Sequence, residues 1–283
     1  MSATGWNGIP SIIPTRRFEG DVTGAKRNII GLALSGGAAR CIGQIGVLEV
    51  LEQEGIRVGA ISGTSGGALI GALYASGKVS LKEMEGIAKG IKWRDVLMAK
   101  FSKRGLISSE KIYRFVKGII GDITFDDLEI PLAITATNLR DGEKVVLTKG
   151  SVARAVQASC SLPVIFTPTE IDGMILVDGG ASSQLPILVA KEELGSGYVI
   201  GVDVNFGAID SARLDNVFQI GIHFISLFAR MNALRERRFA DVVIEVDATG
   251  ISLIDLDKAD LLIARGRRGA EEKIGEIKRM IGG

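Results

Sequence analysis

Ser65 is the residue most suited to covalent chemistry, because it lies in Gly63-Thr64-Ser65-Gly66-Gly67, directly after the apolar stretch 58–62. In a Gly-x-Ser-x-Gly pattern the glycines allow a sharp turn from strand to helix, and the hydroxyl is pushed out at the strand end. The helix that begins there aims free N–H groups at charge that forms beside the serine. A chain with 37 glycines in 283 residues can meet this pattern by chance, so the surroundings of Ser65 must decide its meaning.

A second small-residue loop, 35–40, precedes this serine turn in the chain. Both loops follow predicted strands and lead into predicted helices: strand 28–34, helix 42–54, strand 58–62 and helix 68–76. Because a parallel βαβ unit is right-handed, both loops should lie at the carboxyl edge of the strands. The backbone N–H groups of Gly36, Gly37 and Ala38, with that of Gly66, are therefore candidate donors of an oxyanion hole.

The general base for Ser65 is less obvious, because the chain contains one histidine. His223 lies in the apolar stretch 217–228, whose helical spacing favours a packed or boundary residue. The order Ser65, then Asp178 or Asp203, then His223 nevertheless matches the chain order of an α/β-hydrolase triad. A triad therefore stands as an alternative.

An aspartate that accepts the serine proton directly is the other route. Such a carboxylate should end a strand and have small neighbours that let Ser65 approach. Asp178, followed by Gly179-Gly180, meets this requirement, and Asp203 is the competing acid. The residues alone do not separate the two.

The rest of the chain is long and apolar enough to complete one large α/β domain over 28–283. The patterns predict strands at 131–138, 143–148, 198–204 and 242–246, and a tight hairpin at 171–177 whose second arm is 174–177. They predict helices at 151–159, 186–194, 217–237 and from about 257. Asp141-Gly142 and Asp172-Gly173 are typical of tight turns between paired strands. Residues 1–27 show no sustained period and predict an irregular N-terminal extension.

Residues 78–121 predict a helical insertion with helices at 82–91, 93–100 and 108–120. The segment holds eleven Lys or Arg and four Asp or Glu, a net charge of +7 against +1 for the whole chain. A solvated basic face is the simplest interpretation. Peripheral contact with anionic lipid headgroups is the alternative that suits a lipid substrate.

Composition limits the classes of binding partner and the cellular compartment that we expect for this chain. A net charge of +1 and a pI of about 7.7 give no global field that would favour nucleic acid. Cys41 and Cys160 are too few for a disulfide framework and form no metal-ligand cluster. The start of the chain lacks the pattern of a signal peptide, and no span reaches the ~18–20 apolar residues of a membrane helix. We therefore expect a cytoplasmic protein, with any membrane contact peripheral at the inner membrane surface.

The two loops and the Asp-Gly-Gly sequence, in this order, resemble the bacterial patatin-like phospholipases over about Ile30 to Val246. The family's oxyanion motif, Gly-Gly-Gly-x-Arg/Lys-Gly, is similar to Gly36-Gly37-Ala38-Ala39-Arg40-Cys41. Its nucleophile motif matches Gly63-Thr64-Ser65-Gly66-Gly67, and its Asp-Gly-Gly/Ala motif matches Asp178-Gly179-Gly180. Ala38 and Cys41 stand where the family has glycines, and Gln44 stands where bacterial members commonly have histidine.

The resemblance implies a three-layer α/β/α fold with a mainly parallel sheet and a Ser65–Asp178 dyad, and so selects Asp178 over Asp203. It also implies hydrolysis of acyl esters, often of phospholipids or neutral lipids, without a metal or an organic cofactor. Ala38 can still donate its N–H, although its backbone angles are more restricted than those of glycine. Arg40 is expected to anchor the loop, with contact to a substrate phosphate as the alternative, and Cys41 to be a buried spectator.

Two other function classes compete with an acyl hydrolase. A dinucleotide-binding loop would need glycines at positions 36, 38 and 41, but Ala38 and Cys41 fill two of these, and the second predicted strand lacks the ribose-binding acid. A catalytically silent regulatory protein of the same fold is the remaining alternative. It would not react with a fluorophosphonate serine probe.

Overall fold

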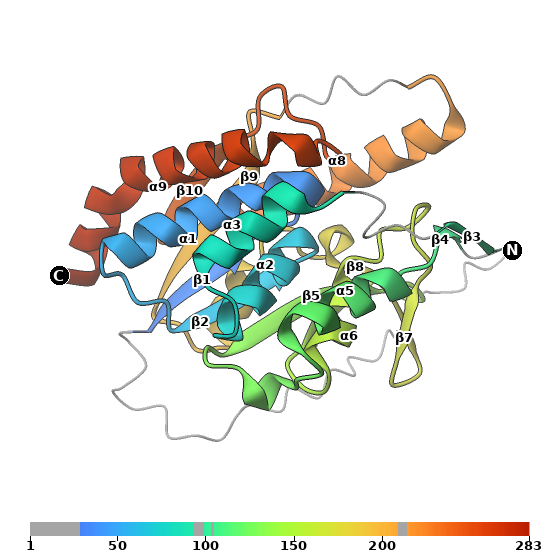
Figure 1. Ribbon diagram of the computed structural model, residues 1–283, viewed down its shortest axis with the longest axis horizontal. Coiled ribbons are helices and arrows are strands. Elements are labelled where there is room, and N and C mark those ends of the chain that lie inside the picture. The colour runs from blue at the N-terminus through green and yellow to red at the C-terminus, as the bar shows by residue number, and fades with distance from the viewer. Residues whose placement is uncertain (1–28, 93–98, 103–104, 209–213, 283) are drawn as a thin grey trace, which may run out of the picture.

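A mixed eight-stranded β-sheet with helices on both faces organises the computed structural model of the chain (Figure 1). The structure describes residues 29–92, 99–102, 105–208 and 214–282. The predicted N-terminal extension, 1–27, and most of the predicted helix 93–100 lie outside these residues.

The strand order is β10-β9-β1-β2-β5-β8-β7, with β6 also paired to β5. The strands are β1 (Ile30–Leu34), β2 (Ala60–Thr64), β5 (Leu132–Asn138), β6 (Lys144–Leu147), β7 (Thr169–Ile171), β8 (Met174–Asp178), β9 (Tyr198–Phe206) and β10 (Val242–Asp247). The five strands from β10 to β5 are mutually parallel, whereas β6, β8 and β7 join by antiparallel pairing. The mainly parallel sheet that the resemblance implied is confirmed.

Helices cover both faces of this sheet. They are α1 (Gly43–Gln53), α2 (Gly66–Ala75), α3 (Leu81–Gly90), α5 (Glu110–Ile120), α6 (Val152–Ser159), α7 (Ile187–Glu192), α8 (Val217–Arg237) and α9 (Ala259–Gly282). Within the described ranges, no helix has the length and apolar character needed to cross a membrane.

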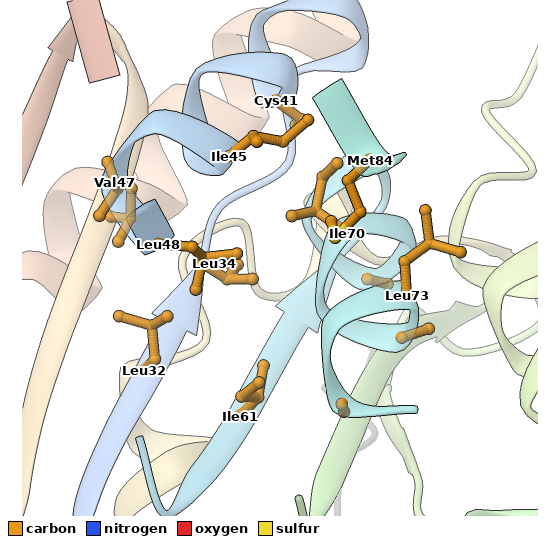
Figure 2. Close-up of a cluster of buried hydrophobic side chains, with 14 of the residues drawn as sticks. Leu32, Leu34, Cys41, Ile45, Val47, Leu48, Ile61, Ile70, Leu73 and Met84 are labelled. Carbon is orange, nitrogen blue, oxygen red and sulfur yellow. The ribbon is translucent and has the colours of Figure 1, made fainter. Parts of the chain in front are cut away.

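Alternation of side chains along β1 shows why three layers form. Leu32 and Leu34 point to one face, where they pack with Ile45 of α1 and Ile70 of α2 in a buried cluster (Figure 2). Ala33 points to the other face, where it packs against α7 residues and the buried Ala233 of α8. A strand buried on both faces must be apolar at every position, and the β1 sequence, IGLAL, meets this demand.

The insertion 78–121 differs from its prediction in the middle. The helices α3 and α5 are present, and α3 begins with a capping box between Ser80 and Glu83. Between them, β3 (Ala99–Ser102) pairs with β4 (Gly105–Ile107), so the prediction that the helix 93–100 extends over residues 99 and 100 is wrong. The Ile107 N–H donates to the carbonyl of Ile165 at 3.0 Å, so pairing with a distant segment favours the extended conformation of β4.

Candidate active site

The turn around Ser65 has a strained backbone geometry. β2 ends at Thr64 and α2 begins at Gly66, and Ser65 between them has φ 53° and ψ −124°. Such a conformation costs a non-glycine residue about 1–3 kcal/mol and persists only where its surroundings hold it. One interaction that stabilises it is the hydrogen bond from the Ser65 N–H to the Oγ of Ser159, at 2.7 Å.

The glycines beside Ser65 are required by close backbone contacts. A Cβ atom at Gly67 would lie 2.4 Å from the carbonyl oxygen of Leu34, and one at Gly63 would lie 2.7 Å from the carbonyl oxygen of Gly67. Neither neighbour is a flexible side chain that could move aside. The motif therefore brings the start of α2 against the end of β1.

The Gly67→Ala variant is accordingly expected to lose about 1–3 kcal/mol of unfolding free energy, because the methyl group has no space beside the β1 backbone. Gly86→Ala is the matched control: Gly86 is also helical, but its Cβ would meet open space, so alanine should stabilise α3 slightly. Urea unfolding of both variants measures the difference. Equal stability of the two variants would contradict this account.

Asp178 lies at the same level of the sheet as Ser65. Thr64 of β2 pairs with Thr135 of β5, and Asp178 of β8 pairs with Ala136, the next residue of β5. Ser65 and Asp178 therefore flank β5 on either side. A Cβ atom at Gly179 would lie 2.4 Å from the Thr135 carbonyl oxygen, so glycine is needed where the chain leaves β8.

The Asp178 carboxylate is buried, and its Oδ1 accepts a hydrogen bond from the Gly180 N–H at 2.8 Å. Burial raises the pKa of Asp178 to about 6, although the nearby Ser65 hydroxyl and the Gly180 N–H act in the opposite direction. A carboxylate with a pKa near neutrality is suited to accept a proton from a serine hydroxyl.

The glycine loop lies beside Ser65, since a Cβ atom at Gly36 would be 3.2 Å from the Ser65 Cβ. The Gly36 N–H donates to the Gln184 carbonyl at 3.1 Å, so the predicted oxyanion role of Gly36 does not fit this hydrogen bond. Among the described residues, the N–H groups of Gly37, Ala38 and Gly66 meet no acceptor. Three of the four predicted donors are thus available.

Two side-chain amides orient the peptide between Gly36 and Gly37. The Gln184 Nε2 and the Asn205 Nδ2 donate to the Gly36 carbonyl oxygen at 2.9 and 2.8 Å. Because C=O and N–H point in opposite directions in a trans peptide, fixing this carbonyl also fixes the N–H of Gly37. Sequence reasoning missed Ser159, Gln184 and Asn205, and no motif signals them.

The family departures in this loop have structural explanations. Ala38 has φ 47°, a backbone conformation that glycine reaches at less cost. It begins a 3-10 helix, Ala38–Ile42, whose first three residues were predicted to belong to a loop. Gln44 donates from Nε2 to the Ser35 carbonyl at 2.8 Å and so braces the loop. Burial raises the pKa of the Cys41 thiol, which therefore stays protonated.

Arg40 lies behind the loop as an anchor. Its buried guanidinium donates from Nε and Nη2 to the carbonyl of Ile251, at 3.0 and 2.8 Å, and from Nη1 to the Oδ1 of Asn205 at 3.2 Å. Asn205 in turn holds Gly36. Arg40 thus supports the loop through the same residue that orients the Gly37 peptide.

The two rivals for the base have other partners. Asp203 accepts from the Asn205 N–H at 3.0 Å and forms an ion pair with Arg237 at 3.5 Å. His223 lies on the cavity wall, and its buried Nδ1 has no hydrogen-bond partner within the described part of the chain. A triad histidine is oriented by a carboxylate at one ring nitrogen, and His223 lacks this contact here.

A cavity of about 830 Å³ joins these groups, with Ser65, Asp178, Gly37 and Ala38 in its wall. One side is formed by α8, through residues that include His223 and Leu227. This volume is in the range of sites that enclose small organic ligands. No described residue of the insertion 78–121 lines it.

Comparison with known proteins identifies the relatives of this chain. Residues 32–191 match the sequence profile of the patatin-like phospholipases. An NTE family protein of Mycobacterium tuberculosis is 34% identical over 195 residues, which are 68% of this chain and 53% of that protein. The lysophospholipase NTE1 of Debaryomyces hansenii is 32% identical over 209 residues, 72% of this chain and 13% of that protein. The chain thus spans about half the length, or less, of these relatives.

Among solved structures, that of VipD from Legionella pneumophila superposes with a TM-score of 0.61 at 14% identity. The superposition covers 89% of this chain and 67% of the VipD chain. At this identity the likeness concerns the fold.

Proposed function

Because the chain belongs to the patatin-like phospholipase family, we propose that it is a lipid acyl hydrolase whose chemistry is carried by Ser65 and Asp178. The observation that supports this most is the Ser65 hydroxyl beside the buried Asp178 carboxylate, whose pKa it lowers, in the wall of one cavity. The pair brings a nucleophile and a base together without a histidine between them.

The proposed reaction is acyl transfer in two halves. The Ser65 Oγ attacks the ester carbonyl while Asp178 accepts the hydroxyl proton, and the N–H groups of Gly37, Ala38 and Gly66 stabilise the oxyanion. The tetrahedral intermediate then expels the alcohol, which takes the proton from Asp178. Asp178 then takes a proton from water, which attacks the acyl-enzyme. Collapse of the second tetrahedral intermediate releases the fatty acid while Asp178 returns the proton to the Ser65 Oγ.

A lysophospholipid is the substrate class we propose first. The D. hansenii relative is named a lysophospholipase, and Ser65 lines a cavity of about 830 Å³, a volume typical of sites for small organic ligands. Release of fatty acid from lysophosphatidylcholine, measured with the purified chain, tests this choice. Hydrolysis of short p-nitrophenyl esters without any release from lysolipids would favour a general esterase instead.

Labelling by a fluorophosphonate separates the dyad from the triad and from a silent protein. The dyad predicts that wild type reacts and that His223→Ala reacts at a rate within about tenfold of wild type, because His223 takes no proton in the mechanism. A triad predicts a loss of about 10³-fold or more in the same variant. A folded wild-type protein that does not react at all would support the catalytically silent alternative.

A further inference from the structure

The helix α8 lies at the edge of the molecule (Figure 1, orange). One of its faces carries a stripe of exposed apolar side chains. The stripe consists of Val217, Ile220, Phe224, Leu227, Phe228, Met231 and Leu234. Its members are between 45% and 86% exposed and follow one another mainly at three- and four-residue intervals, so they share one face of the helix. Such a concentration of exposed large side chains on one helix marks an interaction surface.

The opposite side of α8 is already used in the fold. Ala229 and Ala233 are buried, and the Glu236 carboxylate accepts from the Ser183 hydroxyl at 2.7 Å and from the Leu185 N–H at 3.2 Å. One face of α8 therefore packs against the rest of the fold, and the apolar stripe faces outward.

Exposed charge along the described part of α8 is positive. Arg230 and Arg235 are exposed, and Arg238 follows directly after the helix, whereas the one acidic residue of the helix, Glu236, is buried. The exposed Asp215 precedes the helix at its other end. An apolar stripe with arginines beside it is the composition of helices that lie in the interface of anionic bilayers.

The stripe is continuous with the catalytic cavity. Leu227 and Leu234 belong to the stripe and also line the cavity that holds Ser65 and Asp178. A lipid that leaves a bilayer along the stripe would therefore reach Ser65 without crossing open water. A second copy of the chain seated on the same face would instead cover this side of the cavity.

We propose that α8 lies in the headgroup region of an anionic membrane and delivers the lipid substrate into the cavity. This inference rests on the proposed lipid hydrolase function. We prefer α8 to the basic insertion 78–121 as the membrane-contacting element, because Lys89 of the insertion is paired with Glu85 and Asp260. Lys117 in the insertion is likewise paired, with Asp122.

Vesicle binding by the full chain tests the proposal. We compare sedimentation with vesicles of phosphatidylcholine alone and of an equimolar mixture with phosphatidylglycerol. Wild type should bind the mixed vesicles more tightly, and the double variant Phe224→Ser/Phe228→Ser should bind them about tenfold or more weakly. These two rings contact each other at 4.8 Å between centroids but do not line the cavity, so hydrolysis of a soluble p-nitrophenyl ester should be unchanged.

Leu139→Ser/Leu261→Ser is the matched control, because both leucines are exposed but lie outside α8. It should bind vesicles as wild type does, and thermal unfolding should show that both double variants are folded. Equal vesicle binding by wild type and the α8 variant would overturn the proposal. A wild-type dimer that becomes monomeric in the α8 variant, without vesicle binding by either, would also overturn it in favour of a second copy.

The failure of the proposed function is distinguishable from the failure of this inference. Ser65→Ala should bind mixed vesicles as wild type does, since the Ser65 hydroxyl is remote from the bilayer in this arrangement. Vesicle binding that depends on Phe224 and Phe228 in a chain without hydrolase activity would retain the membrane surface and reject the hydrolase. Hydrolysis of lysolipids without vesicle binding would retain the hydrolase and reject the membrane surface.

Discussion

Alanine at position 65 is expected to lower kcat/KM for p-nitrophenyl esters by about 10⁴-fold or more, because the acyl-enzyme can no longer form. The fold should persist. The Ser65 N–H keeps its hydrogen bond to Ser159, and alanine meets the same backbone demand at φ 53° that serine already meets. Fluorophosphonate labelling should disappear together with the esterase activity.

Ser226→Ala is the matched control for this variant. Ser226 also lines the cavity, but its hydroxyl donates to the Ile222 carbonyl of its own helix at 3.1 Å and faces no base. This variant should keep the activity and the labelling of wild type. Turnover retained by Ser65→Ala, or lost equally by Ser65→Ala and Ser226→Ala, would contradict the assignment of Ser65 as the nucleophile.

The parallel part of the fold could be predicted because its signals are local. The apolar run of β1, the turn at Asp141-Gly142 between β5 and β6, and the helical period of α8 each reflect burial or turn geometry of the segment itself. The β3–β4 hairpin could not be predicted in this way. Its extended conformation depends on backbone pairing between Ile107 and the loop around Phe166, almost sixty residues later.

The candidate site was predictable to a similar extent. Glycines that allow close backbone approach marked Ser65 and Asp178, but the choice of Asp178 over Asp203 came from family resemblance. The ion pair of Asp203 with Arg237 gives that choice a physical basis which the residues alone did not contain. The loss of Gly36 as a donor depends on a contact with Gln184, 148 residues away, which local reasoning does not reach.

Burial of Asp178 has a thermodynamic consequence as well as a catalytic one. The folded-state pKa of about 6 lies above the usual value of 3.8, so ionising this carboxylate in the folded protein is unfavourable. The penalty is absent below about pH 4, grows between pH 4 and 6, and is constant above, where it amounts to about 3 kcal/mol. The group that is proposed to act as the base therefore destabilises the fold at neutral pH.

Asp178→Asn should consequently lose activity and gain stability. An amide of the same shape can still accept from the Gly180 N–H, but it cannot take the Ser65 proton, so turnover should fall by about 10²–10⁴-fold. Its unfolding free energy at pH 7 should exceed that of wild type by up to about 3 kcal/mol, and the gap should close as the pH falls from 6 to 4. Urea unfolding across this pH range measures the gap.

The pH dependence of wild type and the Asp203→Asn variant test whether Asp178 is the base. Wild-type kcat/KM should rise with pH through a midpoint at about pH 6 to a plateau, because the carboxylate must be ionised to accept the proton. Asp203→Asn should stay within about tenfold of wild type, because Asp203 is engaged with Arg237 rather than with Ser65. A large loss in Asp203→Asn together with an active Asp178→Asn would exchange the roles of the two aspartates, since of these two only the one that receives the serine proton is needed for turnover.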